Sequence, residues 1–169
     1  MAGGVVLYPT EGVYGLGALP NRPDAISRII DIKQRDAAKG IILIAAHLAQ
    51  LEDYIDTDAL ASHLTARWPQ AITYVVPAKA ETSPLLTGGR DSIAVRVTAH
   101  PTARALCIAS RSALLSTSAN VSGHPAAAAE ANIDPYLFSK VDAFCEGKLG
   151  GLNKPSAIFD TLNNRWIRK

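Results

Sequence analysis

The sequence predicts one α/β domain, a mixed β-sheet with helices packed on it, spanning residues 1–169. Short apolar runs alternate along the chain with segments of helical periodicity, which is the pattern of strands interleaved with helices. The composition, with 48% hydrophobic and 19% charged residues, suits a chain that folds around a single core. The glycines and prolines between residues 147 and 155 indicate a loop, and no stretch has the composition of a linker between domains.

The first part of the chain predicts a strand, a loop and a helix. Residues 5–8 form a short apolar run that a proline closes, so we expect a buried strand. Residues 10–17 contain three glycines and are predicted to be a loop. Apolar residues then recur at helical spacing, which predicts a helix that Asp24 caps and that ends around residues 33–35.

The middle of the chain predicts two more strands separated by helices. Residues 41–44 are continuously apolar, as in a strand that is covered on both faces. Two leucines suggest a short helix at residues 48–51, and we expect Asp58 to cap a second helix that ends at a proline. Residues 72–76 are β-branched and aromatic, which favours a strand.

The second half begins with the clearest strand of the sequence. Residues 92–97 alternate, so that Ser92, Ala94 and Arg96 share one face and the apolar residues between them share the other. A helix is expected to begin at Pro101. The remaining expected elements are a strand that enters a polar turn at 114–120, a short helix at 126–131, and late strands at 142–144, 157–159 and 166–167.

Several classes of protein are excluded or disfavoured. The net charge of +2 excludes a strongly basic nucleic-acid-binding arm and leaves a local basic groove open. No apolar stretch is long enough to span a membrane, and the first residues lack the basic start of a signal peptide, so we expect a cytoplasmic protein. The two cysteines lack metal-site spacing and the four histidines are scattered, so no preformed metal site is expected.

Three polar clusters are candidates for a site. Lys33, Arg35 and Lys39 follow the first helix, where they either form a solvated helix end or clamp phosphate and carboxylate groups. Arg96 lies across an open strand face next to Ser92, unless that face belongs to an edge strand in water. The run 116–123 supplies hydroxyl and amide groups at the end of a strand, which suits an anionic ligand and is equally typical of a serine-rich turn.

Common nucleotide and hydrolase motifs are absent. The segment 150–156 has two glycines and a lysine but not the order of the P-loop. No dinucleotide-binding glycine pattern follows a strand, and no nucleophile elbow or serine paired with a histidine is evident.

Taken together, the motifs resemble the YrdC-like family, in order and spacing over essentially the whole chain. They are YPTEGVYGLG at 8–17, KQR at 33–35, AVRV at 94–97, HP at 100–101, STSANVSG at 116–123 and PS at 155–156. Each string is short, but together they are very specific. The match is to the short, single-domain members, so we expect no further C-terminal domain. Only four residues precede the first predicted strand, so either the start is truncated or misassigned or the usual N-terminal helix is missing.

The resemblance implies an activity and a fold. The family condenses L-threonine, bicarbonate and ATP, normally with Mg²⁺, to L-threonylcarbamoyladenylate and pyrophosphate. Partner proteins then transfer the threonylcarbamoyl group to the adenosine 3′ of the anticodon in tRNAs that read ANN codons. The fold implied is a twisted α/β sheet with a concave, positively charged face, and weak RNA binding is compatible with such a face.

The resemblance also assigns residues. Lys33 and Arg35 are the expected catalytic residues, because charge that builds on phosphoryl oxygens needs cationic stabilisation. The expected ATP contacts are Lys33, Arg35, Lys39, Ser92, Ser118, Asn120 and Arg168. The expected threonine contacts are Thr10, Tyr14, Arg96, Ser116 and Ser156. Glu11 and the tyrosines are the only candidates for a general base.

One position departs from the family. Many members carry a threonine where this chain has Gly12, so either Thr10, Tyr14 or a backbone group takes over that contact or selectivity for threonine is looser. Gly12→Thr is expected to sharpen selectivity at little cost in folding, provided that Gly12 does not require a positive φ. Two other functions remain open: an RNA-binding or ribosome-assembly module that uses the same basic concavity, and a nucleotide-binding regulator without catalysis. Neither would release pyrophosphate in a reaction that depends on threonine and bicarbonate.

Overall fold

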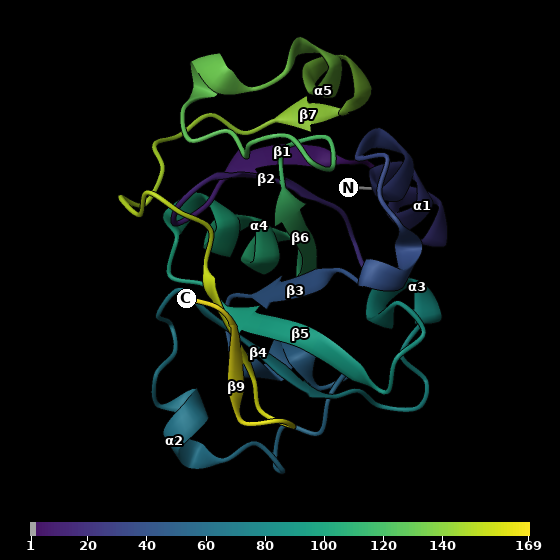
Figure 1. Cartoon of the computed structure of the whole chain (residues 1–169), viewed down its shortest axis with the longest axis vertical. Helices are drawn as coiled ribbons and strands as arrows, with labels where there is room; N and C mark the ends of the chain where they lie inside the picture. Colours follow the sequence, from purple (N-terminus) through teal and green to yellow (C-terminus); the bar gives the residue numbers. More distant parts are fainter. Residues whose placement is uncertain (1–2) are drawn as a thin grey trace.

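The computed structural model describes residues 3–169 and contains a nine-stranded mixed sheet (Figure 1). The order of the strands across the sheet is β7-β1-β2-β6-β3-β5-β4-β8-β9. The strands are β1 (Val6–Pro9), β2 (Tyr14–Gly17), β3 (Ile42–Ala45), β4 (Ile72–Pro77), β5 (Ser92–Val97), β6 (Leu114–Ser118), β7 (Ala143–Phe144), β8 (Ala157–Asp160) and β9 (Arg165–Arg168). The predicted α/β class and mixed sheet are confirmed.

Helices connect the strands and flank the sheet. The α-helices are α1 (Pro23–Ile32), α2 (Ser62–Thr65), α3 (Pro84–Thr87), α4 (Pro101–Ser110) and α5 (Pro135–Lys140). Three 3₁₀ turns add η1 (Ala37–Lys39), η2 (Leu48–Leu51) and η3 (Glu130–Asn132). None of the helices found within residues 3–169 has both the length and the apolarity that crossing a bilayer requires.

Strand β2 lies where a loop was predicted, and that prediction is wrong for residues 14–17. The strand pairs antiparallel with β1, and Thr10 closes the turn between them, because its amide and its hydroxyl both donate to the carbonyl of Val13 at 3.2 and 2.7 Å. Two of its four residues are glycines, which removes the alternation of side chains that marks a strand in sequence.

The helix predictions are correct for α1 and α4 and need correction elsewhere. Asp24 lies in the first turn of α1 and not at its N-cap, which is Arg22, because Pro23 is the first helical residue. Ala61, not Asp58, precedes the short α2. The helix expected at 126–131 does not form; only η3 overlaps it. Helices α3 and α5 were not predicted, since they span only four and six residues.

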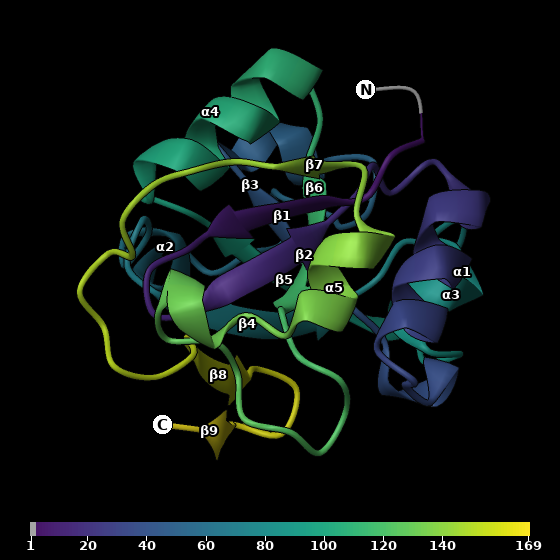
Figure 2. The ribbon, with the colours of Figure 1, turned by 90° about the horizontal axis from the view of Figure 1, so that it is seen from above.

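The helices cover the two faces of the sheet unequally. Buried residues of α1, α3 and α5 belong to the larger core on one face, and α4 packs on the other face against β1, β3 and β6. Figure 2 shows α4 and α5 on opposite sides of β1 and β2. Because α4 reaches only part of its face, the floor beyond it stays open.

That open floor crosses five neighbouring strands. The pairing registers place Ser116 of β6, Ile42 of β3, Ala94 of β5 and Val75 of β4 side by side, with Asp160 of β8 next in line. Their side chains share the face that α4 leaves uncovered. Ala94 is small, as expected for a residue on an open sheet face.

Candidate active site

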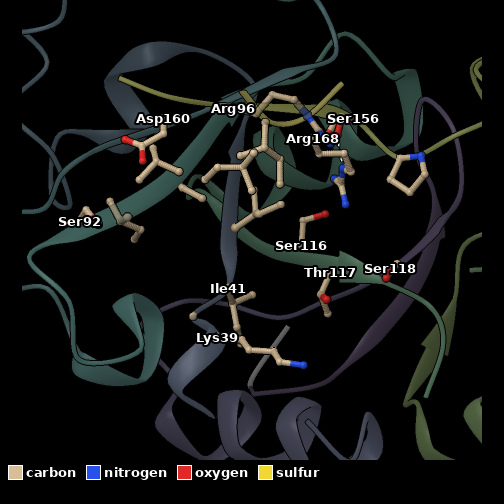
Figure 3. Close-up of a pocket in the computed structure, with 18 of the residues that line it drawn as sticks. Lys39, Ile41, Ser92, Arg96, Ser116, Thr117, Ser118, Ser156, Asp160 and Arg168 are labelled. Atoms are coloured by element: carbon tan, nitrogen blue, oxygen red, sulfur yellow. Dashed lines mark hydrogen bonds between the residues drawn. The ribbon is translucent and has the colours of Figure 1, made fainter. Parts of the chain in front are cut away.

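A cavity of about 670 Å³ lies on this floor, and residues from both ends of the chain line it. Ten of the residues that the sequence assigned to the site face it: Thr10, Tyr14, Arg35, Lys39, Ser92, Arg96, Ser116, Ser118, Ser156 and Arg168. Lys33 and Asn120 are not among the lining residues. Figure 3 shows Arg96, Ser156 and Arg168 together at one end and Lys39 at the other.

The lining is electropositive. Its cationic residues are Arg35, Lys39, Arg90, Arg96, Arg165 and Arg168. Its single carboxylate, on Asp160, already accepts hydrogen bonds from the amides of Leu162 and Asn163 and from the Asn163 side chain. A cavity lined by six cationic side chains and one carboxylate that is already hydrogen-bonded suits an anionic ligand.

The end of α1 separates Lys33 from Arg35. Gln34 adopts a left-handed conformation with φ of 48°, while the amides of Gln34 and Arg35 donate to the carbonyls of Asp31 and Ile30. This is the Schellman arrangement that ends helices. Because the chain reverses between the two basic residues, their side chains leave the helix in different directions.

Lys33 is buried and holds the turn after β6. Its ammonium group donates to the carbonyl oxygens of Ser118 and Asn120 and, at 3.2 Å, to Oδ1 of Asn120. Ser118 Oγ donates to the same Oδ1 at 2.6 Å. Burial, with Arg35 adding to it, lowers the pKa of Lys33 to about 8. Lys33 and Asn120 therefore shape the turn that presents Ser118 to the cavity.

Arg35 lies at the mouth of the cavity and pins the turn that follows α1. Its guanidinium donates to the Gly40 carbonyl at 2.6 Å and to Thr117 Oγ1 at 3.2 Å, and its buried Nε has no partner within residues 3–169. Burial, and then the positive charge of Arg90, lowers the pKa of Arg35. Two cations held together in this way favour the binding of an anion between them.

Arg90 was missed by the sequence analysis. It donates to the carbonyls of Ala38 and Lys39 at 2.6 and 3.0 Å, so the two arginines fix three successive carbonyls of the same turn. Nothing in the local sequence around Arg90 points to a site. Its role becomes visible only because η1 and the segment after α3 pack together, with the amide of Ile41 donating to the carbonyl of Leu86.

Arg96 forms a buried ion pair with Glu11 at 3.1 Å. Arg96 also donates weakly to Thr73 Oγ1 at 3.4 Å, and Thr98 donates to the other oxygen of Glu11 at 2.6 Å. Burial raises the pKa of Glu11, but Arg96 and the Thr98 hydroxyl outweigh it, so the pKa is lowered. Glu11 is therefore a charge partner of Arg96 and a poor general base.

The Glu11–Arg96 pair predicts an acid-dependent loss of stability. The pKa of Glu11 in the folded protein lies below its ordinary value of 4.5. Its contribution to stability is therefore complete above about pH 4.5 and is lost as the pH falls through the folded pKa. Glu11→Gln leaves Arg96 without a counter-charge, and we expect Tm at pH 7 to fall by about 5 °C or more.

The measurement is Tm against pH for the wild type and Glu11→Gln. The difference in Tm between the wild type and Glu11→Gln should be constant near neutral pH and should become smaller below about pH 4.5. The reason is that Glu11 becomes protonated in the wild type, whereas the glutamine side chain does not titrate. Parallel curves down to the lowest pH would show that Glu11 is not an ionised partner of Arg96.

Ser156, another predicted threonine contact, is linked to Arg96 through Thr73, and Arg168 lies beside it. Ser156 shares a hydrogen bond of 3.1 Å with Thr73, and its carbonyl accepts from Nε of Arg168 at 2.8 Å. Burial, and then Arg96, lowers the pKa of Arg168. Tyr14 donates to the Gly147 carbonyl at 3.0 Å. Neighbouring contacts of this kind fix side chains before any ligand arrives.

The loop at 147–155 packs on the segment that carries Glu11. The amides of Gly150 and Leu152 donate to the carbonyls of Thr10 and Glu11 at 3.0 and 2.9 Å. A β-carbon on Gly12 would lie 1.9 Å from the carbonyl oxygen of Lys154. The expectation that Gly12→Thr costs little in folding is therefore wrong, because a backbone carbonyl occupies the space that the side chain needs.

Within residues 3–169 no three His, Cys, Asp or Glu side chains gather in a way that could hold a metal ion. The acidic groups near the cavity are engaged, Glu11 with Arg96 and Asp160 with its own turn. A magnesium ion at this site would be held by the phosphate oxygens of a nucleotide, as is usual for this ion.

Comparison with known proteins shows the family to which the chain belongs. The profile of the Sua5/YciO/YrdC family, described as "Telomere recombination", matches residues 1–169. Two curated relatives named threonylcarbamoyl-AMP synthase are 42% identical, from Xanthomonas campestris, and 44% identical, from Halorhodospira halophila. The first alignment covers 98% of this chain and 91% of the relative, and the second covers 99% and 88%.

Solved structures show the same fold. P. abyssi Sua5 complexed with L-threonine is 32% identical with a TM-score of 0.86, over 95% of this chain and 48% of Sua5. E. coli YciO is 28% identical with a TM-score of 0.83, over 98% of this chain and 82% of YciO. The chain thus spans about half the length of Sua5. Because the family profile matches the whole sequence and full-length relatives exceed 40% identity, the chain belongs to the Sua5/YciO/YrdC family.

Proposed function

We propose that this protein forms L-threonylcarbamoyladenylate and pyrophosphate from L-threonine, bicarbonate and ATP, as a threonylcarbamoyl-AMP synthase. The observation that carries the proposal is the division of one cavity into two cationic ends. Arg35 and Arg90 donate to the turn that carries Lys39 at one end, and Arg96 and Arg168 lie at the other. Full-length relatives that carry the name of this enzyme support it.

The chemistry needs positioning more than covalent catalysis. The amine of threonine adds to carbon dioxide derived from bicarbonate and loses a proton, which gives a carbamate. A carbamate oxygen then attacks the α-phosphorus of ATP, and the bond to the β-phosphate oxygen breaks to release pyrophosphate. Because negative charge gathers on the phosphoryl oxygens, fixed cations such as Arg35 stabilise the transition state. Mg²⁺ enters with ATP and neutralises part of that charge.

The phosphates belong at the Arg35 end. Arg35 and Lys39 supply cations there, and Ser118 presents a hydroxyl from the turn that Lys33 and Asn120 hold. In this arrangement Lys33 positions the turn while its pKa stays near 8, and Arg35 contacts phosphate directly. Ser92 and Arg168 complete the proposed nucleotide contacts.

Threonine belongs at the Arg96 end. A guanidinium held by a buried carboxylate presents a fixed edge to the substrate, and a planar fork suits a carboxylate. Ser116 and Ser156 supply hydroxyl groups near it, and Thr10 and Tyr14 also line the cavity. Sua5, to which this chain is similar, has been crystallised with L-threonine.

The product is an activated acyl adenylate, so a partner enzyme must consume it. We propose that tRNA threonylcarbamoyl-transfer proteins take the group to the adenosine 3′ of the anticodon in tRNAs that read ANN codons. We propose a cytoplasmic location for these steps, and weak RNA binding by the cationic cavity is compatible with them.

The test is pyrophosphate release. ATP consumption must depend on both threonine and bicarbonate, and the adenylate must carry the threonylcarbamoyl group by mass spectrometry. An RNA-binding module would release no pyrophosphate, and its affinity for RNA would fall steeply with salt. A nucleotide-binding regulator would bind ATP without turnover. Absence of turnover with all three substrates present would remove the proposal.

Arg96→Lys tests the threonine end. Lysine keeps the charge that Glu11 requires but cannot make two parallel hydrogen bonds to a carboxylate. The KM for threonine should therefore rise about tenfold or more, with the KM for ATP almost unchanged. Steady-state kinetics with each substrate varied in turn measures both. A variant that loses ATP affinity and keeps threonine affinity contradicts the assignment.

A further inference from the structure

Tyr8 is a fully buried tyrosine whose hydroxyl reaches the cavity lining. It belongs to β1, and its hydroxyl donates to Ser116 Oγ on β6 at 2.9 Å. Strand β2 lies between these two strands. A β-carbon on Gly17 of β2 would lie 2.7 Å from the ring of Tyr8, so the missing side chain lets the ring cross β2.

The direction of this hydrogen bond is fixed by acidity. A phenol is a far stronger acid than an aliphatic alcohol, so it is the better donor of the pair. Burial raises the pKa of Tyr8 well above its ordinary value, so the phenol remains protonated across the whole working range of pH. The oxygen of Ser116 therefore accepts a hydrogen bond from the Tyr8 phenol, and the proton of Ser116 itself points elsewhere.

The hydroxyl proton of Ser116 is free to donate to a ligand in the cavity. Ser116 lines it, and no acceptor for this proton is found among residues 3–169. Figure 3 shows Ser116 beside the group formed by Arg96, Ser156 and Arg168. Arg96 is close enough to Tyr8 to act on its pKa, although less than burial does. A donor facing two guanidinium groups requires an anionic oxygen between them.

We propose that Tyr8 is a positioning residue that holds Ser116 as a hydrogen-bond donor to the carboxylate of the bound amino acid. The proposal rests on the proposed function, in which that carboxylate belongs to L-threonine and Arg96 binds its other edge. A serine hydroxyl has one donor and two acceptor lone pairs, and the bond from Tyr8 occupies one lone pair and fixes the hydroxyl, so that donation toward the ligand is favoured. The buried pair thus favours a carboxylate over a group that would itself donate.

A double-mutant cycle on threonine binding tests this coupling. Calorimetry with L-threonine alone, without ATP or bicarbonate, measures Kd for the wild type, Tyr8→Phe, Ser116→Ala and the double variant. Ser116→Ala should raise Kd about tenfold or more, as expected for one hydrogen bond to a charged group, and Tyr8→Phe should raise it by a measurable part of that factor. The double variant should bind no more weakly than Ser116→Ala, because Tyr8 acts only through Ser116. The proposal would be overturned if the fold-changes in Kd of the two single variants multiply in the double variant. It would also be overturned if Tyr8→Phe binds threonine with the wild-type Kd.

Tyr74→Phe is the matched control. Tyr74 is a second fully buried tyrosine of the same sheet, and it does not line the cavity. Its substitution should leave the Kd for threonine unchanged. Tm is recorded for every variant, since a purely structural role of the Tyr8–Ser116 pair would move Tm and leave Kd alone.

Ser116→Cys keeps the test decisive if Tyr8→Phe does not fold. A thiol occupies nearly the same volume but is a weak donor, so Ser116→Cys should weaken threonine binding as Ser116→Ala does. Wild-type binding by the cysteine variant would show that donation is not needed. If the proposed function itself is wrong, the wild type will release no pyrophosphate. That assay therefore distinguishes failure of the proposed function from failure of the coupling between Tyr8 and Ser116.

Discussion

Replacing Arg35 by alanine should lower the rate of pyrophosphate release about 10- to 100-fold while the protein remains folded. Arg35 is half-buried at the mouth of the cavity, and its Nε lacks a partner within residues 3–169. A hydrogen bond to a charged group contributes about 1.5–3 kcal/mol, which corresponds to this range of rates. Burial and Arg90 together make the site favour an incoming anion.

Two further variants show whether the charge of Arg35 alone is sufficient and whether the loss of a nearby arginine outside the cavity has the same effect. Arg35→Lys keeps the charge and loses the fork, so it should recover only part of the rate. Arg28→Ala is the matched control: it removes an arginine of α1, seven residues before Arg35, that pairs with Asp142 at 2.7 Å and does not line the cavity, and turnover should not change. Full activity in Arg35→Ala would reject the phosphate contact.

Gly12→Thr should destabilise the protein by roughly 2–3 kcal/mol, which corresponds to a fall in Tm of about 5–10 °C. The cause is a clash and not backbone conformation. The β-carbon would lie 1.9 Å from the carbonyl oxygen of Lys154 and 2.8 Å from the carbonyl carbon, so the loop must move. Because that loop leads to Ser156, activity should fall together with stability.

Gly12→Ala should show most of the same loss, because the first carbon already clashes. Gly4→Ala is the control: its β-carbon would meet mainly the carboxylate end of the Asp142 side chain at 3.3 Å, which can turn aside. Thermal unfolding of the three variants measures the difference. A stable Gly12→Thr protein with sharper selectivity for threonine over serine would restore the original expectation and show that the loop is not fixed.

Local sequence is sufficient where one element alone sets the pattern. Residues 92–97 alternate because a strand with one buried face requires it, and β5 has those bounds. The placement of Arg35 two residues after Lys33 at the end of a helix was also readable, since apolar periodicity stops there. The motifs of the sequence further indicated which residues would gather, and ten of the assigned residues line one cavity.

Local sequence fails where a residue's role depends on a distant segment. Strand β2 was missed because Gly15 and Gly17 carry no side chains to alternate, and the reason for Gly17 is the ring of Tyr8 on the neighbouring strand. Arg90 was missed because the turn that it holds lies about fifty residues earlier in the chain. No local pattern encodes either contact.

The sequence by itself thus determined the class of fold, most of the strands and the chemical types of the groups in the site, because periodicity and composition are local properties. The tertiary structure decided how those groups act. It turned Lys33 toward the turn at Ser118 and Asn120, paired Arg96 with Glu11, and filled the space beside Gly12 with a carbonyl group. Each of these depends on segments that only the packed sheet brings within a few ångströms, where burial makes charges and hydrogen bonds decisive.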